Sequence, residues 1–290
     1  MDFNSWNKFW SSVFGLLAVL IVLCNFFTIW AFHKQRRRKR TYFLLISLAV
    51  TDLLVGLLTI PFFIKNSSME SSPSLWHVST SFDVFTGLTS IYTLAVVSLE
   101  RMFATIWPLR HRTLTFCSYI SAIAIPWVSG AIFTLLMILH FNEIELQSYN
   151  ILLILFLVTP LLTICVAYLS IWIKQKSTKG VRNHRAARES KLANTLLLIT
   201  GASLFTWTPF QISQILLVFE GFRIPHILIY LIKLLQFSNS LVNVLIYPLR
   251  MPDFQTTLKN IFQCIRTRRS TIGPSSQAIH LKRIAYCDAK

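Results

Sequence analysis

Seven long runs of apolar residues dominate this sequence, and they are rich in Leu, Ile, Phe and Trp. Each run can cross a hydrocarbon core of about 30 Å as a helix that rises 1.5 Å per residue. A lone strand in lipid would leave its backbone polar groups unpaired, so we expect every run to be helical. The runs cover residues 10–32, 42–64, 75–106, 117–140, 149–173, 192–219 and 225–248. The sequence therefore predicts an all-α, seven-transmembrane helix bundle.

The composition favours lipid over water as the solvent of this chain. Of its 290 residues, 54% are hydrophobic and 13% are charged, whereas soluble domains carry about 25% charged residues. The first run is too long for the core of a signal peptide, and a strongly basic segment from His33 to Arg40 follows it directly. We therefore interpret the first run as a spanning helix and expect no cleavable signal peptide.

The distribution of Lys and Arg predicts the orientation of the bundle. With the amino terminus outside, 24 of the 28 basic residues fall on the cytoplasmic side, all except Lys8, Lys65, Arg223 and Lys233. Lys and Arg prefer the cytoplasmic loops of membrane proteins, so we expect a multi-pass protein of the plasma membrane with an extracellular amino terminus. A basic inner surface faces anionic lipid, which accounts for the net charge of +17 without nucleic acid.

A glycosylation sequon and three charged residues inside the runs are candidate functional features. Asn66-Ser67-Ser68 falls in the first predicted outer loop, where a glycan at Asn66 would be expected. Asp52, Asp83 and Lys233 lie within predicted spans. A charged side chain in mid-bilayer costs several kcal/mol unless it faces a polar interior, so these residues are functional candidates.

Four short motifs lie on four of the predicted helices, and their joint order is very specific. The second helix carries Leu48-Ala49-Val50-Thr51-Asp52, and the third ends with Glu100-Arg101-Met102. The sixth carries Trp207-Thr208-Pro209, and the seventh carries Asn243-Val244-Leu245-Ile246-Tyr247. In this order the chain resembles the rhodopsin-like G-protein-coupled receptors over almost its whole length. It departs from the usual motifs where Met102 replaces an aromatic residue and Val244 replaces a proline.

The resemblance implies a two-state switch at the cytoplasmic face. Glu100 would hold Arg101 in the inactive state, and Glu189 at the inner start of the sixth helix would offer a second partner. Breaking this link would free Arg101 for a heterotrimeric G protein. The alternative is a cytoplasmic-edge salt bridge of little energetic worth. The remaining switch residues implied by the resemblance are Trp207, Pro209, Asn243, Tyr247 and Tyr168.

The resemblance also implies a sodium ion in the middle of the bundle. Its ligands would come from helices two, three and seven, and they are Asp52, Ser90, Asn239, Ser240 and Asn243. These oxygen donors suit a hard cation. A buried hydrogen-bonded network around Asp52 without an ion remains the alternative. We expect no other cofactor.

Asp83 is the leading candidate for contact with an extracellular small-molecule or peptide ligand. It lies five helical turns outward of Arg101, and in the aminergic receptors of this family the matching aspartate pairs with the ligand ammonium. Lys233 on the seventh helix is able to neutralise Asp83 internally. Two hypotheses stay open: an amine bound by Asp83, or an Asp83–Lys233 latch that a zwitterionic or uncharged ligand opens. The other expected ligand contacts are Trp207, Phe210, Gln211, Gln214 and Phe237.

Two features differ from what is usual in the family: the placement of the cysteines, and the residue at the position where opsins bind retinal. By the predicted topology none of the five cysteines lies on the outer face, and Trp76 occupies the helix-three position of the family's usual disulfide bridge. Phe237 occupies the position of the lysine that binds retinal in opsins, so a retinal Schiff base is disfavoured.

Beyond the seventh helix, the spacing of Phe254, Leu258, Ile261 and Phe262 predicts a short amphipathic helix along the inner membrane face. Cys264 at its end is a candidate for palmitoylation, with an unmodified cysteine as the alternative. Serines and threonines of the tail are plausible targets of receptor kinases and would then recruit arrestin. We thus expect an extracellular amino terminus over residues 1–9, a receptor domain over 10–248, and a cytoplasmic amphipathic helix and tail over 249–290.

The sequence favours a receptor that transduces an extracellular ligand signal to heterotrimeric G proteins. A membrane transporter or channel is the alternative from another class, although no internal repeat is visible. A receptor-like protein that no longer signals is a further alternative, given Met102 and Val244. We expect no enzymatic activity, because the sequence has no His, Cys or carboxylate cluster with metal or triad spacing.

Overall fold

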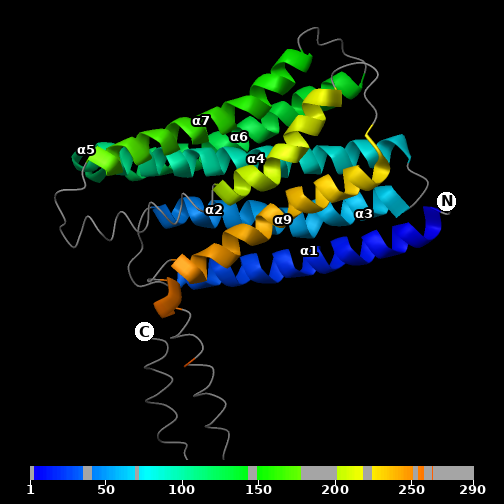
Figure 1. Cartoon of the computed structure of the whole chain (residues 1–290), viewed down its shortest axis with the longest axis horizontal. Coiled ribbons are helices and arrows are strands. Elements are labelled where there is room, and N and C mark those ends of the chain that lie inside the picture. The colour runs from blue at the N-terminus through cyan, green and yellow to red at the C-terminus, as the bar shows by residue number, and fades with distance from the viewer. Residues whose placement is uncertain are drawn as a thin grey trace, which may run out of the picture.

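Helices lying side by side form the described part of the chain, which covers residues 3–34, 41–68, 72–142, 149–177, 201–217, 224–250, 254–257 and 263 of a computed structural model (Figure 1). The named helices are α1 (Phe3–His33), α2 (Thr41–Leu54), α3 (Ile60–Ser68), α4 (Pro73–Ile106), α5 (Pro108–Thr113), α6 (Phe116–Phe141), α7 (Tyr149–Ser177) and α9 (His226–Arg250). A π-helical turn, η1 (Val55–Thr59), joins α2 to α3, and residues 201–217 are also helical. The predicted all-α bundle is confirmed.

Six helices in the described ranges are long and apolar enough to cross a membrane. They are α1, the continuous α2–η1–α3 helix, α4, α6, α7 and α9. The remaining apolar run of the sequence, 192–219, is described over residues 201–217.

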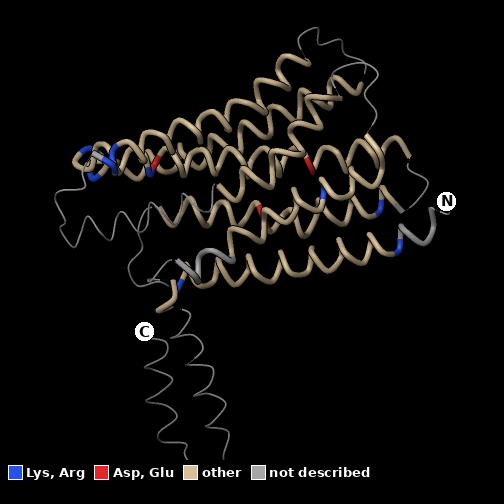
Figure 2. Tube along the Cα trace, in the orientation of Figure 1, with Lys and Arg blue, Asp and Glu red and all other residues tan. Residues whose placement is uncertain are grey.

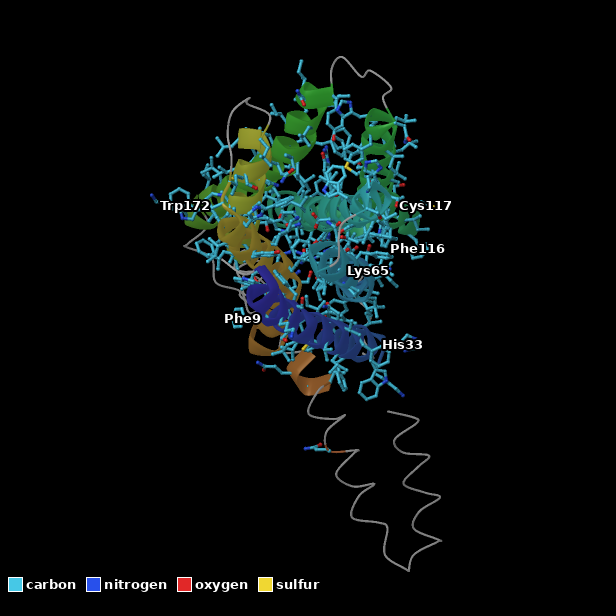
Figure 3. All side chains as sticks on the ribbon, turned by 90° about the vertical axis from the view of Figure 1, so that its right-hand side faces the viewer. Phe9, His33, Lys65, Phe116, Cys117 and Trp172 are labelled. Carbon is cyan, nitrogen blue, oxygen red and sulfur yellow. The ribbon has the colours of Figure 1, made fainter. Side chains whose placement is uncertain are left out.

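The side chains of this bundle are distributed as expected for a protein dissolved in lipid. Large apolar side chains face outward: Phe9 is 56% exposed, Phe116 59% and Trp172 57%, and all three lie on the outside of the bundle in Figure 3. The polar side chains of Asp52 and Asn243 are buried instead. Exposed apolar surface on this scale would be costly in water, so lipid must cover it.

Helix α4 is the central element of the bundle. It packs against α6 and α7 on one side and against α2 and η1 on the other, while α1 packs against α2, α3 and α9. Gly130 of α6 permits the close approach to α4, because a Cβ atom there would lie 2.4 Å from Thr89 Oγ1 and 3.1 Å from the Phe85 carbonyl oxygen. The centre of the bundle thus lies around α4.

Local sequence explains where α4 begins and ends. Ser72 caps its first turn, since its hydroxyl oxygen accepts a hydrogen bond from the backbone N–H of Leu75 at 3.3 Å, and Pro73 follows at the first helical position. The helix stops at Trp107, which precedes Pro108, because a following proline disfavours the helical conformation. The second proline-led helix, α5, was not expected from the sequence.

The turn η1 interrupts what the sequence predicts as one regular helix. Pro61 lies two residues beyond the turn and cannot donate a backbone hydrogen bond to the Leu57 carbonyl, so a wide turn, closed by the Ile60 N–H on the Val55 carbonyl, accommodates the break. Gly56 lies in the same turn, where a Cβ atom would be 2.8 Å from Val22 Cγ2 of α1. A larger residue would push α1 away.

Several helix ends differ from the expected boundaries. Helix α1 begins at Phe3 rather than Trp10, and α3 runs to Ser68, so Asn66 lies in a helix rather than in a loop. Of the predicted amphipathic helix, residues 254–257 are described and helical, and the buried Phe254 ring packs against Phe32 at 5.2 Å between centroids. Cys264 lies outside the described residues.

Replacing Gly130 by alanine is expected to lower the free energy of unfolding by about 1–3 kcal/mol, because the new methyl group would overlap Thr89. The thermal unfolding temperature of the purified protein in detergent measures this effect. Gly15→Ala is the control, since a Cβ atom at Gly15 of α1 meets nothing within 4 Å. Equal unfolding temperatures for the two variants would contradict the close packing of α4 on α6.

Candidate functional site

An ion pair links α4 to α9 in one half of the bundle. The Lys233 ammonium pairs with Asp83 Oδ2 and also donates a hydrogen bond to Gln236 Oε1 at 3.0 Å. Gln236 Nε2 in turn donates to Asp83 Oδ1 at 3.0 Å. The three side chains form a closed ring of polar contacts, which we call the latch.

The surroundings of the latch are apolar and largely closed to solvent. The side chains of Asp83 and Lys233 are each 13% exposed. The Lys233 ammonium lies 4.1 Å from the centroid of the Phe210 ring and 5.7 Å from that of Phe237. Aromatic faces attract a cation, but they carry no net charge, so Lys233 and Asp83 depend on each other for neutrality.

The latch forms one wall of a narrow cavity inside the bundle, with a volume of about 10 Å³. Its lining residues are Val55, Asp83, Thr86, Gly87, Ser90, Trp207, Gln236, Phe237 and Ser240. The cavity therefore reaches from the latch to the polar side chains in the middle of the bundle.

Trp207 lies against α4 on the wall of this cavity. A Cβ atom on Gly87 would be 2.8 Å from Trp207 Cη2, so the glycine makes room for the indole ring. The ring is 5% exposed, and its N–H has no hydrogen-bond partner among the residues that the structure describes. A molecule entering the cavity would meet both the ring and this unpaired donor.

A hydrogen-bond network around Asp52 connects three helices in the middle of the bundle. The fully buried carboxylate accepts from Ser240 Oγ at 2.8 Å and from Asn243 Nδ2 at 3.0 Å. Asn25 of α1 donates to the Ser240 carbonyl at 3.1 Å. The network ties α2 to α9 and α9 to α1.

The residues around Asp52 fit a sodium ion in part. Ser90 Oγ and Asn243 Oδ1 are buried, and neither has a hydrogen-bond partner within the described ranges, so both oxygens are available beside the carboxylate network. Asn239 Oδ1 accepts a hydrogen bond from Thr206 at 3.2 Å, which leaves this oxygen a second lone pair. The contacts and the cavity bring together four of the expected donors, Asp52, Ser90, Ser240 and Asn243, and Asn239 stays a prediction.

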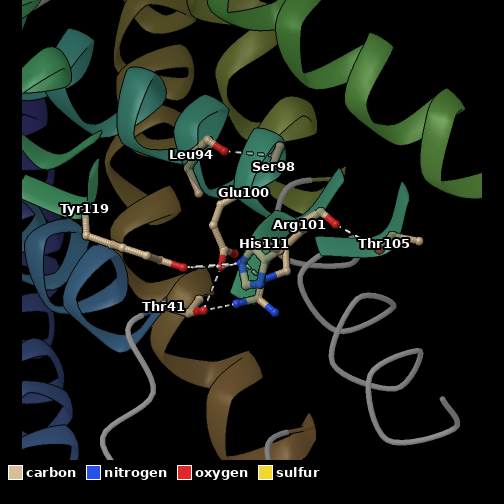
Figure 4. Close-up of polar contacts among 8 residues, drawn as sticks. All are labelled: Thr41, Leu94, Ser98, Glu100, Arg101, Thr105, His111 and Tyr119. Atoms are coloured by element: carbon tan, nitrogen blue, oxygen red, sulfur yellow. Dashed lines mark hydrogen bonds and ion pairs between the residues drawn. The ribbon is translucent and has the colours of Figure 1, made fainter. Parts of the chain in front are cut away.

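A second charged cluster lies near the opposite end of α4 (Figure 4). Glu100 Oε2 is 2.7 Å from Arg101 Nε, and these side chains are 7% and 11% exposed. Thr41 at the start of α2 donates to Glu100 Oε1 at 3.0 Å and accepts from Arg101 Nη2. The pair is therefore largely buried, although it lies at the end of α4.

Two further side chains bind the same carboxylate from the adjoining helices. His111 Nε2 of α5 lies 2.8 Å from Glu100 Oε1, and the Tyr119 hydroxyl of α6 donates to that oxygen at 3.2 Å. Tyr119 and His111 also contact each other at 3.3 Å. Glu100 therefore holds the segment after α4 against the bundle.

Sequence reasoning missed Gln236, His111, Tyr119 and Thr41. Gln236 follows Lys233 by three residues and so shares its helix face, a signal that was available. The position of His111 depends on the turn into α5, which the sequence did not predict. Of the expected switch residues, Glu189 and the side chain of Tyr247 lie outside the described part of the chain.

The other residues expected to contact a ligand or to act in the switch differ in how deeply they are buried. Gln211 is 2% exposed, and neither polar atom of its side-chain amide has a hydrogen-bond partner in the described ranges. Gln214 and Pro209 are half-buried in the helix over residues 201–217. Tyr168 of α7 is half-buried and packs against the main hydrophobic core.

Comparison with known proteins identifies similar sequences along most of the chain. The family described as 7 transmembrane receptor (rhodopsin family) matches residues 24–247. Trace amine-associated receptor 7b of Mus musculus is 27% identical over 86% of this chain and 81% of that receptor. Trace amine-associated receptor 6 of Rattus norvegicus is 28% identical over 92% of this chain and 90% of its own length. The histamine H2 receptor of Homo sapiens is 28% identical, with coverages of 89% and 80%.

Replacing Asp83 by leucine is expected to lower the free energy of unfolding by about 3 kcal/mol or more, because it leaves the buried Lys233 ammonium without a counter-charge. The double variant Asp83→Leu/Lys233→Met removes both charges and should recover most of this loss. Thermal unfolding of the purified variants in detergent measures the coupling. Additive losses in the double variant would show that the two charges do not stabilise each other.

Proposed function

This chain belongs to the rhodopsin family of seven-transmembrane receptors, and we propose that its ligand acts at the latch of Asp83, Lys233 and Gln236. The protein is a multi-pass G-protein-coupled receptor that transduces an extracellular ligand signal to heterotrimeric G proteins. The family match does not favour a transporter or channel. Its relatives are receptors, and this chain likewise has no catalytic role.

The receptor lies in the plasma membrane with its amino terminus outside the cell. The distribution of basic residues supports this orientation: Lys and Arg gather at the α5 end of the bundle, opposite the end marked N (Figure 2). Arg101, Arg110 and Arg112 belong to this basic end. Basic residues prefer the cytoplasmic side, so the latch opens toward the extracellular side, where Asn66 carries a glycan.

The ligand carries an ammonium group that binds Asp83. The names of the relatives support this assignment, since they are receptors for trace amines and histamine. Asp83 supports it as well, because its largely buried carboxylate lies on the wall of a cavity inside the bundle. That cavity is the single observation on which the proposed function depends.

The signal passes from the latch to the inner cluster along the helices that line the cavity. A ligand in the cavity presses on Trp207, two residues before Pro209. Pro209 lacks a backbone donor, so the helix over residues 201–217 bends most easily there. Asp83 and Arg101 are about 27 Å apart along α4 at 1.5 Å per residue, and a rigid-body tilt of helices spans this distance.

At the cytoplasmic face, activation breaks the contacts of Glu100 with Arg101, Thr41 and His111. The freed Arg101 then binds the G protein. In the resting state these contacts keep α5 and α2 against α4, so the cluster acts as the closed position of a two-state switch.

A sodium ion in the middle of the bundle would stabilise the resting state. Asp52, Ser90, Ser240 and Asn243 would hold it, and the two buried oxygens without partners in the described chain support this assignment. The ion would supply a positive charge to a carboxylate whose described partners are neutral donors.

The tail regulates the receptor after activation. Receptor kinases modify its serines and threonines, arrestin binds the phosphorylated tail, and a palmitoyl group on Cys264 anchors it to lipid. The basic residues of the tail support contact with anionic lipid.

Replacing Arg101 by alanine is expected to abolish stimulated signalling, while His111→Phe should raise the basal signal about fivefold. Losing one contact to Glu100 removes about 1 kcal/mol from the resting state, which changes the ratio of the two states by that factor. A G-protein dissociation assay in cells measures both effects at matched surface expression. Arg110→Gln, a change of an exposed neighbour in α5, is the control. If Arg101→Ala signals like the wild type, the proposed mechanism is wrong.

Sodium chloride is expected to raise the thermal unfolding temperature of the ligand-free receptor above that in equimolar choline chloride. At thirty times its dissociation constant, an ion that binds only the folded state stabilises it by about 2 kcal/mol. The Asp52→Asn variant should lose this difference, because the carboxylate is removed while its neighbours remain. A sodium effect of unchanged size in the variant would place the ion elsewhere.

A further inference from the structure

The latch raises a problem of charge that an ammonium ligand alone does not solve. If such a ligand takes Asp83, the Lys233 ammonium, whose side chain is 13% exposed in the closed latch, loses its counter-charge. In the described part of the chain, the other carboxylates are those of Asp52 and Glu100, and both already have other partners. A simple amine would therefore exchange one cation for another and leave a buried charge unpaired.

Ligands of the other simple charge types meet a similar obstacle. A carboxylate without an amine would pair with Lys233 and leave Asp83 with only the neutral amide of Gln236. An uncharged ligand would have to separate the two charges and supply neither of them with a partner. Only a molecule with both charges gives each latch residue a new counter-ion.

We infer that the ligand of this receptor is a small zwitterion, an amino acid or a close analogue, whose ammonium pairs with Asp83 and whose carboxylate pairs with Lys233. This inference rests on the proposed function and specifies the chemical class of the ligand. Ligand binding then replaces the one ion pair of the latch by two ion pairs between the receptor and the ligand. No charge is left unpaired in the low-dielectric interior.

Gln236 is able to make the same two kinds of hydrogen bond with this ligand as it makes in the latch. Its Oε1 accepts from the Lys233 ammonium at 3.0 Å, and its Nε2 donates to the Asp83 carboxylate at 3.0 Å. A ligand ammonium and carboxylate offer the same donor and acceptor. Because one amide group contacts both charges, the two charged groups of the ligand lie close together, separated by a few carbon atoms.

The cavity beside the latch limits the character of the rest of the ligand. With the latch closed its volume is about 10 Å³, room for about one water molecule, so the space for a ligand forms only when the latch opens. Val55, Trp207 and Phe237 give it apolar walls. The zwitterion therefore carries a short apolar or aromatic side chain that reaches Trp207.

Matched sets of compounds test this inference in cells that express the full-length receptor. Each set contains an amino acid, its decarboxylated amine and its deaminated acid, such as phenylalanine, phenethylamine and 3-phenylpropionate, or histidine, histamine and imidazolepropionate. G-protein dissociation is the readout. We expect at least one amino acid to stimulate the wild type, with its amine and its acid at least tenfold less potent.

Lys233→Met separates the zwitterion from a simple amine. In this variant the amine should gain at least tenfold in potency and the amino acid should lose its advantage, because Asp83 is now an unpaired carboxylate. Lys233→Arg, which keeps the charge, is the control and should retain the preference for the amino acid. Surface staining of a tagged chain shows that each variant reaches the membrane.

Three outcomes overturn the inference: an amine as potent as its amino acid in the wild type, no stimulation by any amino acid, or an unchanged preference in Lys233→Met. Activation of the wild type by amines alone would leave the proposed receptor function intact and reject the zwitterion. The proposed function fails separately, if the basal signal is the same in wild type, Arg101→Ala and His111→Phe.

Discussion

The ion pair between Asp83 and Lys233 joins two helices in a bundle whose outer surface is made of apolar side chains. In lipid, a lone charge at this depth would destabilise the helix that carries it. Each residue of the pair therefore offsets the free-energy cost of burying the other. Together with Gln236, the pair sets the relative position of α4 and α9. The shape of the cavity beside it depends on that position.

Three polar layers follow one another along the bundle, and each joins different helices. The latch joins α4 to α9, the Asp52 network joins α2 and α1 to α9, and the Glu100 cluster joins α4 to α2, α5 and α6. Apolar packing against α4 fills the space between the layers. Neighbouring layers share a helix: α9 belongs to the latch and to the Asp52 network, and α2 belongs to the Asp52 network and to the Glu100 cluster. A movement of a shared helix therefore changes the contacts of both layers.

The sequence was sufficient for the fold because lipid leaves so few choices for the backbone. Length and apolar composition predicted the helices, and spacing along α4 correctly predicted that Asp83 faces the interior. The same reasoning did not find His111, since its contact with Glu100 depends on how α5 turns back after Pro108. The hydrogen bond that Asn239 accepts from Thr206 was not expected either, because side-chain orientation depends on the neighbouring helix.

The wide turn η1 changes the faces of α3 on which its side chains lie. A π turn holds one residue more than an α turn, so every side chain beyond Thr59 is rotated by about 100° from where a regular helix would direct it. Counting outward from Asp52 along a regular helix would therefore assign Phe62 and Phe63 to the wrong faces. With the turn in place, Phe62 stacks on Phe82 of α4 and Phe63 contacts Phe14 of α1, so one extra residue decides which neighbouring helix each ring packs against.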